Sequence, residues 1–341
     1  MPPFAQGHHR PAMESGQDMS HGQCDATLSG GYRMSKRQTR DTAASIKARL
    51  LNYAKRNSEA FDLVLVRFAL ERLLYRLSRS RHRDGFVVKG AILFQVWSKL
   101  MHRPTRDLDL LAAGPPTIET FIDIFRELCA QPVEDDGLVF AADTVTATRI
   151  KEDEEYEGIR MRFEANLGSA RIPIQVDLGF GDAVTPNASP LVFPSILELP
   201  APELLSYPRE TVVAEKFQAM VMLGIANSRM KDFFDLLTLC RQFEFDGELV
   251  RRAIQATFKR RKTSIPTSLP LALTEEFSQD QQKSMQWNAF LKKSGLGEEN
   301  LSLSELAGRL ADFLMPPARA ADLETSFDMF WKPAEGWTDR A

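Results

Sequence analysis

Residues 86–110 read FVVKGAILFQVWSKLMHRPTRDLDL, and they hold the clearest structural pattern in the chain. A short apolar strand at 86–88 leads through a Lys-Gly pair into a segment, 91 to about 100, with the apolar spacing of an amphipathic helix. A loop follows, and a second apolar strand begins at Asp107. The pattern predicts a strand, a glycine turn, a helix and another strand in direct succession.

The second strand carries two carboxylates. Because side chains alternate between the faces of a strand, Asp107 and Asp109 are predicted to share one face, while Leu108 and Leu110 face the core. Two carboxylates on one face of a buried strand repel each other and lose hydration, which is costly unless a cation offsets it. A pair with only oxygen donors suits Mg²⁺ or Mn²⁺, which would also hold nucleotide phosphates.

The glycine turn before this strand adds a second feature. Gly90 allows backbone N–H groups to approach an anion at the positive end of the following helix, so a phosphate cradle precedes the metal-binding strand. This layout resembles the nucleotidyltransferase fold, and the sequence KGA…RPTRDLDLL is similar to that of the AbiEii/AbiGii toxin family within this fold. Ala91 stands where many nucleotidyltransferases have serine or glycine, so only backbone contacts to phosphate are available at that position.

Composition narrows the class of protein. With 341 residues, 43% of them hydrophobic and 26% charged, the chain has the make-up of a soluble globular protein of one large or two ordinary domains. A net charge of −3 gives no global basic field, so contact with nucleic acid would need local patches. The scattered Cys24, Cys129 and Cys240 favour a reducing compartment over a zinc site. No apolar run reaches the roughly 18 residues of a membrane span, and we expect a cytoplasmic protein.

The chain is expected to divide into three regions. Residues 1–38, rich in Gly, His, Gln and Ser, read as a disordered tail, with Met34 as an alternative start. The resemblance implies a nucleotidyltransferase core at 39–205 and a helical C-terminal domain at 206–341 that completes the active site. The expected fold class is α+β, with a mixed β-sheet, flanking helices and a mainly helical C-terminal region.

Other segments predict the remainder of the core. Helices are predicted at 42–56, 61–77 and 117–130, and strands at 139–150 and 156–167 with a hairpin tip at 151–157. The charged residues of 61–77 are expected to be solvated. The basic run 78–84 is interpreted as a solvated loop, with contact to RNA as the alternative. For the basic run 257–263, contact with a phosphate backbone and a charged helix end are two equal alternatives.

A third carboxylate follows in RIPIQVDLGFGD, residues 171–182. Apolar residues alternate there with Gln175 and Asp177, which indicates a strand. Nucleotidyltransferases commonly take a third metal-site carboxylate from a neighbouring strand, and this resemblance makes Asp177 the candidate. Asp182 is interpreted as a turn residue only, and 183–205 as a Pro-rich connection.

A lysine interrupts the apolar arc of the next predicted helix, 210–223 (ETVVAEKFQAMVML). Residues placed at about 100° steps put Lys216 inside this arc, whereas Glu215, Thr211 and Gln218 fall on the polar side. A buried ammonium group needs a partner or a cavity. We favour a lysine that faces a triphosphate over one that snorkels to the surface.

The following helix, predicted within 227–243, carries two aspartates. Asp232 is placed at the edge of its buried side, and Asp235 is expected to face outward with Lys231. Acidic residues in a first turn could simply complement the helix dipole, and Arg229 could form a structural ion pair with Asp232.

Family resemblance extends to these two segments, since ETVVAEK and NSRMKDFFDLL are similar to the second and third signatures of the AbiEii-type toxins. The resemblance implies that Lys216 binds nucleotide phosphates and that Asp232 or Asp235 completes the catalytic site. It further implies an antitoxin encoded separately, often a repressor, that need not form a stable complex.

The residues predict a metal-dependent enzyme that acts on a nucleoside triphosphate, and the resemblance implies that it is a nucleotidyltransferase. Expected catalytic residues are Asp107, Asp109, Lys216, Asp232 and Asp235. Residues expected to bind the nucleotide are Lys89, Gly90, Ala91, Thr105, Arg106, Lys216, Arg229 and Lys231. Expected ligands of Mg²⁺ or Mn²⁺ are Asp107, Asp109 and Asp177.

The resemblance implies transfer from a nucleoside triphosphate to an RNA acceptor, such as the 3′ end of a tRNA, in a toxin–antitoxin or phage-defence system. Two alternatives remain open: a non-catalytic nucleotide- or RNA-binding module on the same fold, and a metal-dependent nuclease. A monomer without membrane contact is expected.

Overall fold

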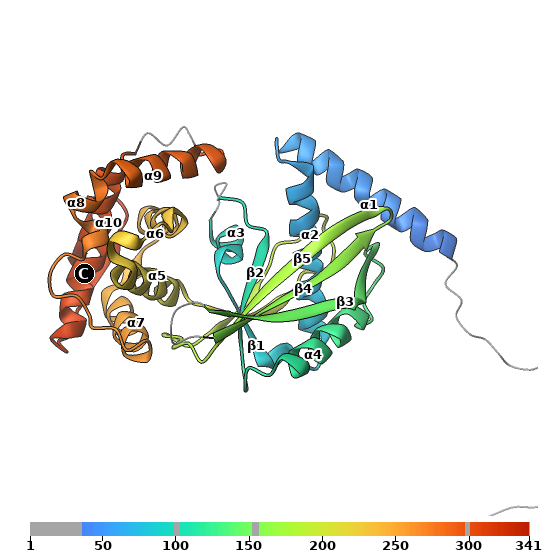
Figure 1. The fold of residues 1–341 in the computed structure, drawn as a ribbon, viewed down its shortest axis with the longest axis horizontal. Coiled ribbons are helices and arrows are strands. Elements are labelled where there is room, and N and C mark those ends of the chain that lie inside the picture. Colours follow the sequence, from blue (N-terminus) through green and yellow to red (C-terminus); the bar gives the residue numbers. More distant parts are fainter. Residues whose placement is uncertain (1–35, 99–102, 152–156, 297–300, 341) are drawn as a thin grey trace, which may run out of the picture. The chain divides into compact units, whose positions relative to one another are not determined.

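The computed structural model describes residues 36–98, 103–151, 157–296 and 301–340 (Figure 1). Most of the expected tail, Met34 and Cys24 lie outside these residues, as do positions 152–156 of the expected hairpin tip. The first helix, α1 (Lys36–Arg56), begins within the last positions assigned to the tail.

A mixed sheet forms the centre of the fold. Within the described residues it has seven strands in the order β3-β4-β5-β2-β1-β7-β6. They are β1 (Phe86–Lys89), β2 (Asp107–Ala112), β3 (Leu138–Lys151), β4 (Glu157–Leu167), β5 (Ala170–Phe180), β6 (Ser189–Val192) and β7 (Glu203–Ser206). The pairs β2–β5 and β1–β7 are parallel and the others antiparallel. The expected α+β class with a mixed sheet is confirmed.

The sheet extends further than the sequence predicted. Strands β6 and β7 lie in the segment that was expected to be a connection, so that expectation was wrong. Both strands are short, and neither shows a long apolar alternation, because β6 forms the edge of the sheet and leaves much of its surface exposed.

Helices α2 (Phe61–Arg79) and α4 (Ile118–Ala130) accompany this sheet, with the short turn η1 (Arg83–Gly85) before β1. The ring of Phe125 on α4 lies 5.8 Å from that of Phe163 on β4, and Phe121 lies 5.3 Å from Phe180 on β5. Because side chains alternate along a strand, the residues next to Phe163 and Phe180 in sequence point to the opposite face. That opposite face carries the carboxylates described below.

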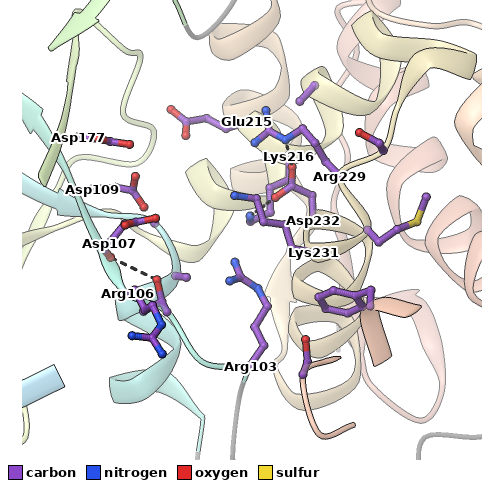
Figure 2. A pocket seen from close by; sticks show the side chains of 18 of the residues that line it. Arg103, Arg106, Asp107, Asp109, Asp177, Glu215, Lys216, Arg229, Lys231 and Asp232 are labelled. Carbon is purple, nitrogen blue, oxygen red and sulfur yellow. Dashed lines mark hydrogen bonds and ion pairs between the residues drawn. The ribbon is translucent and has the colours of Figure 1, made fainter. Parts of the chain in front are cut away.

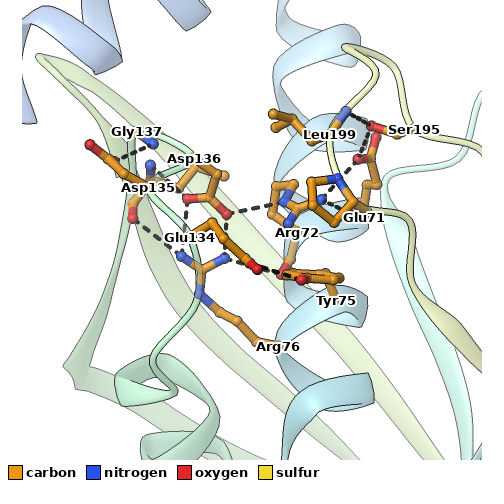
Figure 3. A network of polar contacts seen from close by, with 12 residues as sticks. Glu71, Arg72, Tyr75, Arg76, Glu134, Asp135, Asp136, Gly137, Ser195 and Leu199 are labelled. Atoms are coloured by element: carbon orange, nitrogen blue, oxygen red, sulfur yellow. Dashed lines mark hydrogen bonds and ion pairs between the residues drawn. The ribbon is translucent and has the colours of Figure 1, made fainter.

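Helix α2 also contains a buried polar network (Figure 3). Arg76 and Arg72 donate to Asp136 at 2.6 and 3.1 Å, while Glu71 accepts from Ser195 at 2.8 Å. The prediction of a solvated charged face was therefore wrong for Glu71, Arg72 and Arg76. Loops before β3 and after β6 cover this side of the helix, and helical spacing cannot distinguish a charged face in water from one covered by loops.

The segment between β1 and β2 is less helical than predicted. A 3-10 turn, η2 (Ala91–Leu93), is followed by one turn of α-helix, α3 (Phe94–Trp97). The chain is extended at Ser98, so the predicted helix up to about residue 100 is replaced by two short turns.

The C-terminal region is mainly helical, as predicted. Its helices are α5 (Arg209–Leu223), η3 (Gly224–Ala226), α6 (Met230–Gln242), α7 (Gly247–Arg260), η4 (Leu271–Leu273), α8 (Glu275–Ser278), α9 (Gln281–Lys293) and α10 (Leu303–Asp322). A small sheet that was not predicted joins β8 (Phe245–Asp246), β9 (Met329–Lys332) and β10 (Gly336–Asp339). Trp331 and Trp337 pack on Phe313 at 4.8 and 5.8 Å, so this sheet closes the core of the region.

Two residues on the predicted polar side of α5 are buried. Thr211 and Gln218 are both fully buried. Gln218 donates to Thr263 at 2.8 Å and accepts from Arg261 at 3.0 Å, so the loop after α7 supplies its partners. No helix among the described residues is both long and apolar enough to cross a membrane.

Candidate active site

A cavity of about 1250 Å³ is bordered by the sheet on one side and by α5, α6 and α9 on the other (Figure 2). Its lining brings together segments from β1 to α9, including three aspartates of the sheet and the Lys216 and Asp232 positions of the helical region. The three separate sequence motifs therefore meet in one place.

Strand pairing places the carboxylates side by side. In the parallel pair of β2 and β5, Asp109 lies opposite Asp177 and Asp107 lies opposite Gln175. Leu108 and Leu110 are buried in the core, so the predicted alternation of β2 is confirmed. Figure 2 shows Asp107, Asp109 and Asp177 on the same side of the cavity.

Gly90 is required by the position of Asp109. Its φ of +76° lies in a region that residues with a side chain rarely adopt. A Cβ atom at this position would lie 1.9 Å from Oδ2 of Asp109, far inside van der Waals contact. The glycine therefore gives room to a carboxylate, a role beyond the expected approach to phosphate.

Asp177 is engaged by an arginine that the sequence reading did not include. Arg160 on β4 donates from Nε and Nη2 to the two carboxylate oxygens of Asp177, at 2.8 and 2.7 Å. Burial raises the pKa of Asp107 above its usual value, and the charge of Asp177 adds to this effect. A cation near Asp107 would relieve both causes.

The donor set fits a divalent ion in part. Asp107 and Asp109 offer oxygen donors on one face of β2, as Mg²⁺ or Mn²⁺ prefers. Among the described residues, however, no three or more His, Cys, Asp or Glu side chains are grouped as metal ligands. Both oxygens of Asp177 accept hydrogen bonds from Arg160, so the third expected ligand already has an arginine as its partner.

Lys89 ends β1 beside Asp109 and reaches Asp182 at 2.7 Å. The hydroxyl of Tyr207 donates to the same carboxylate at 3.0 Å, and Arg261 lies 3.7 Å away. Burial by itself raises the pKa of Asp182, but the charge and hydrogen bond of Lys89 outweigh it and hold the pKa below its usual value. The interpretation of Asp182 as a turn residue only was wrong, because its partners are far away in sequence.

A network of charges forms the opposite wall. Lys216 lies 2.7 Å from Asp232 and 2.8 Å from Asp235. Arg103 donates two hydrogen bonds of 2.8 Å to Asp235, and Arg229 lies 2.6 Å from Asp232. Three cations thus surround two carboxylates, which leaves this wall with a net positive charge.

Two sequence expectations concern this network. The prediction that Lys216 needs a partner is confirmed. Burial by itself lowers the pKa of Lys216, but the charges of Asp232 and Asp235 outweigh burial and raise the pKa, so Lys216 stays charged. The prediction that Asp235 faces outward was wrong, because α6 is buried on both sides and the Asp235 side chain is 0% exposed.

The other expected nucleotide-binding residues differ in position. Ala91 lines the cavity, and Thr105 donates to the backbone oxygen of Asp107 at 3.2 Å. Arg106 also lines the cavity and pairs with Asp62, and Lys231 is exposed and lines the cavity without an ion-pair partner among the described residues.

Sequence reasoning missed three residues of the site, namely Arg103, Arg160 and Glu215. Glu215 points from α5 toward the sheet aspartates (Figure 2). Only Arg103 could have been found from sequence, because it lies within the RPTRDLDLL motif. Arg160 and Glu215 acquire their positions through strand pairing and helix packing.

Comparison with known proteins identifies a family that matches most of the chain. The family model described as "Nucleotidyl transferase AbiEii toxin, Type IV TA system" matches residues 72–321. No match was found among curated proteins. Two crystal structures from Helicobacter pylori, of a proposed nucleotidyltransferase and of JHP933, are each 14% identical with a TM-score of 0.41, covering 75% of this chain and 93% and 90% of theirs.

Proposed function

The chain belongs to the AbiEii nucleotidyl transferase toxin family of type IV toxin–antitoxin systems, and from this we propose that it transfers a nucleotide from a nucleoside triphosphate to an RNA acceptor, the 3′ end of a tRNA. Membership makes it a nucleotidyltransferase with a nucleoside triphosphate as substrate and an antitoxin as partner. We propose that the antitoxin is encoded separately and acts without a stable complex, and that the enzyme works in the cytoplasm, where its substrates are.

The observation that carries this proposal is the pairing of two walls of opposite charge across one cavity. The β2 carboxylates lie on one side, and the network of Arg103, Lys216 and Arg229 lies on the other with an excess of positive charge. A triphosphate needs cations along its phosphates and a carboxylate-bound metal at the reacting phosphorus. The cavity offers positions for both.

Asp107 and Asp109 would hold the divalent ion, and Asp177 would join them only by giving up its pair with Arg160. Such an ion, when bound, stabilises the negative charge that develops on the α-phosphate and on the leaving pyrophosphate. The backbone at Gly90 and Ala91 lies beside Asp109 and is proposed to contact the phosphates. Residues proposed to line the phosphate path as well are Lys89, Thr105, Arg106, Lys216, Arg229 and Lys231.

The reaction forms one bond and breaks one. The oxygen of the acceptor hydroxyl bonds to the α-phosphorus, the bond from that phosphorus to the bridging oxygen breaks, and pyrophosphate leaves with the electron pair. The hydroxyl proton passes to solvent or to a cavity carboxylate. Asp232 is better suited to positioning than to accepting it, because the charges of Lys216 and Arg229 outweigh burial and hold the pKa of Asp232 below its usual value. Asp235, which pairs with Lys216 and Arg103, is proposed as a positioning residue as well.

The proposal is tested by transfer of label from each α-³²P nucleoside triphosphate, with Mg²⁺, to total cellular RNA. We expect a labelled band of tRNA size, reduced about a hundred-fold or more by Asp107→Ala. Asp123→Ala is the matched control, since Asp123 is an exposed aspartate on α4 and the label should persist.

Three other outcomes would each indicate a different function. Label in protein instead of RNA would make a polypeptide the acceptor. RNA that is shortened without added nucleotide would indicate a nuclease. Bound nucleotide with no label in any acceptor would favour a non-catalytic binding module.

A further inference from the structure

The pair of Arg160 and Asp177 lies where a third metal ligand was expected. Strand register fixes it: Asp177 on β5 has Asp109 of β2 as its neighbour on one side and Arg160 of β4 on the other. These residues share the cavity-facing side of the sheet. Asp177 can therefore meet either a metal shared with Asp109 or the guanidinium of Arg160, and strand pairing brings both within reach.

The geometry favours the guanidinium. Its Nε and Nη2 atoms each meet a different oxygen of Asp177, at 2.8 and 2.7 Å, which is the fork arrangement that gives strong pairing between arginine and a carboxylate. The Asp177 side chain is 14% exposed, so water screens the pair only in part. By contrast, Asp107 has no ion-pair partner among the described residues.

Arg160 has N–H donors that Asp177 does not use. A guanidinium has five N–H groups, of which two are used by Asp177, so three remain. Its side chain is 30% exposed and lines the same cavity as Lys216 and Asp109. An arginine cannot lose its charge in a protein, and its planar guanidinium can donate to two oxygens of one anion, so an arginine fixed beside a cavity is suited to binding a phosphate group.

We propose that Asp177 anchors Arg160 instead of ligating the metal, and that the remaining donors of Arg160 bind a phosphate group of a substrate. The inference deepens the proposed function and rests on it. Asp107 and Asp109 are then the metal-binding carboxylates of the sheet, and Asp177 is a positioning residue. The phosphate could belong to the nucleoside triphosphate or to the RNA backbone, because both offer the same chemistry.

Metal binding is measured first, by titrating Mn²⁺ into the full chain in a calorimeter without nucleotide. We expect Asp177→Asn to bind Mn²⁺ within about threefold of the wild type, and Asp109→Asn to bind it about tenfold or more weakly. A loss in Asp177→Asn as large as that in Asp109→Asn would overturn the proposal. This measurement does not depend on transfer activity, so it remains informative even if the proposed reaction fails.

Phosphate binding is measured second, with Arg160→Gln, Asp177→Asn and two controls. Arg162→Gln changes the next arginine on the same face of β4, and Arg126→Gln changes an exposed arginine on α4. We expect Arg160→Gln and Asp177→Asn each to raise the KM for the same substrate by about tenfold, with little change in kcat. Arg160→Lys, which keeps the charge but not the fork, should lie between.

The substrate whose KM changes identifies the source of the phosphate. A rise in KM for the nucleoside triphosphate alone assigns Arg160 to the donor, and a rise for RNA alone assigns it to the acceptor. Direct binding of a triphosphate and of a short single-stranded RNA, each without the other, replaces KM if no transfer occurs. The proposal would be refuted if Arg160→Gln left the binding of both the triphosphate and the RNA unchanged. It would also be refuted if the main effect of Arg160→Gln were tighter binding of Mn²⁺.

Discussion

At Gly90 the absence of a side chain allows the carboxylate of Asp109 to lie against the backbone. Gly90 directly follows β1 and Asp109 lies in β2, and Lys89, just before the glycine, is the register partner of Asp109. A contact this close couples the shape of the turn to the position of a carboxylate that we propose to be catalytic. Catalysis is sensitive to such positions, since a displacement of about 1 Å can cost about a hundred-fold in rate.

Gly90→Ala is therefore expected to reduce nucleotidyl transfer about a hundred-fold while leaving the chain folded. The free energy of unfolding, from urea denaturation, should fall by about 1–3 kcal/mol because of backbone strain. Gly114→Ala is the matched control: its φ is +90°, but a Cβ there would meet nothing within 4 Å. Equal losses of activity in both variants would show that strain alone, and not displacement of Asp109, is responsible.

At the scale of whole elements, α2 is joined to the start of β3 by charged groups. Asp136 is 3% exposed and accepts from both Arg72 and Arg76. Burial by itself raises the pKa of Asp136, but the hydrogen bond and charge of Arg76, together with Arg72, outweigh it and lower the pKa. Glu71 on the same helix is the opposite case, because burial dominates and raises its pKa.

This arrangement predicts a pH dependence of stability. A carboxylate whose folded pKa is lowered adds stability above its unfolded pKa, near 3.8, and that stability is lost as pH falls through the folded value. Asp136→Asn should lower the free energy of unfolding by about 3–5 kcal/mol at pH 7, because two buried arginines lose their partner. The difference from the wild type should shrink as pH falls below about 3.8.

Urea denaturation from pH 7 down to pH 3 measures this effect, with Asp123→Asn as an exposed control that should follow the wild type. Glu71 does not obscure the result. Because its pKa is raised, the ionisation of Glu71 destabilises the fold, and this effect begins as pH rises above its ordinary pKa of 4.5. The effect of Glu71 on stability therefore has the opposite sign to that of Asp136. A difference that stayed constant over the whole range would mean that the ion pairs of Asp136 are not its source.

At the scale of the molecule, the site combines the sheet with the helical region. The sheet supplies Asp107 and Asp109, and α5 and α6 supply Lys216 and its partners. Arg103 precedes β2 in sequence and yet forms its hydrogen bonds with Asp235 on α6, so one side chain joins the two walls. A ligand that contacts both walls should then stabilise the fold as a unit.

Thermal unfolding with and without a nucleoside triphosphate tests this expectation. With Mg²⁺ present, a triphosphate at a hundred times its Kd should add about 2.7 kcal/mol of stability and shift one cooperative transition. Removing the metal with EDTA, or replacing Asp107 in Asp107→Asn, should reduce the shift. A shift that neither change affects would show that the triphosphate does not bind through the carboxylate wall.

The sequence alone was sufficient for the features that depend on local pattern. Alternation in β2 placed Asp107 and Asp109 on one face, because a strand has a fixed period of two, whereas the pairing of β2 with β5 brought Asp177 beside them. The apolar arc of α5 showed that Lys216 needs a partner, because an unpaired ammonium is costly to bury. The mixed sheet and the helical C-terminal region followed from the same periodicities and from the family resemblance.

Only the tertiary structure decided which charged groups are buried and which partners they have. Lys89 and Asp182 are 93 residues apart in sequence, and Arg103 and Asp235 are 132 apart, so no local pattern links them. Helical spacing identifies one buried face, but α2, α5 and α6 are covered on more than one, and their second faces are polar. Polar residues can be buried there because each finds a partner on a distant segment, and that pairing exists only once the chain is folded.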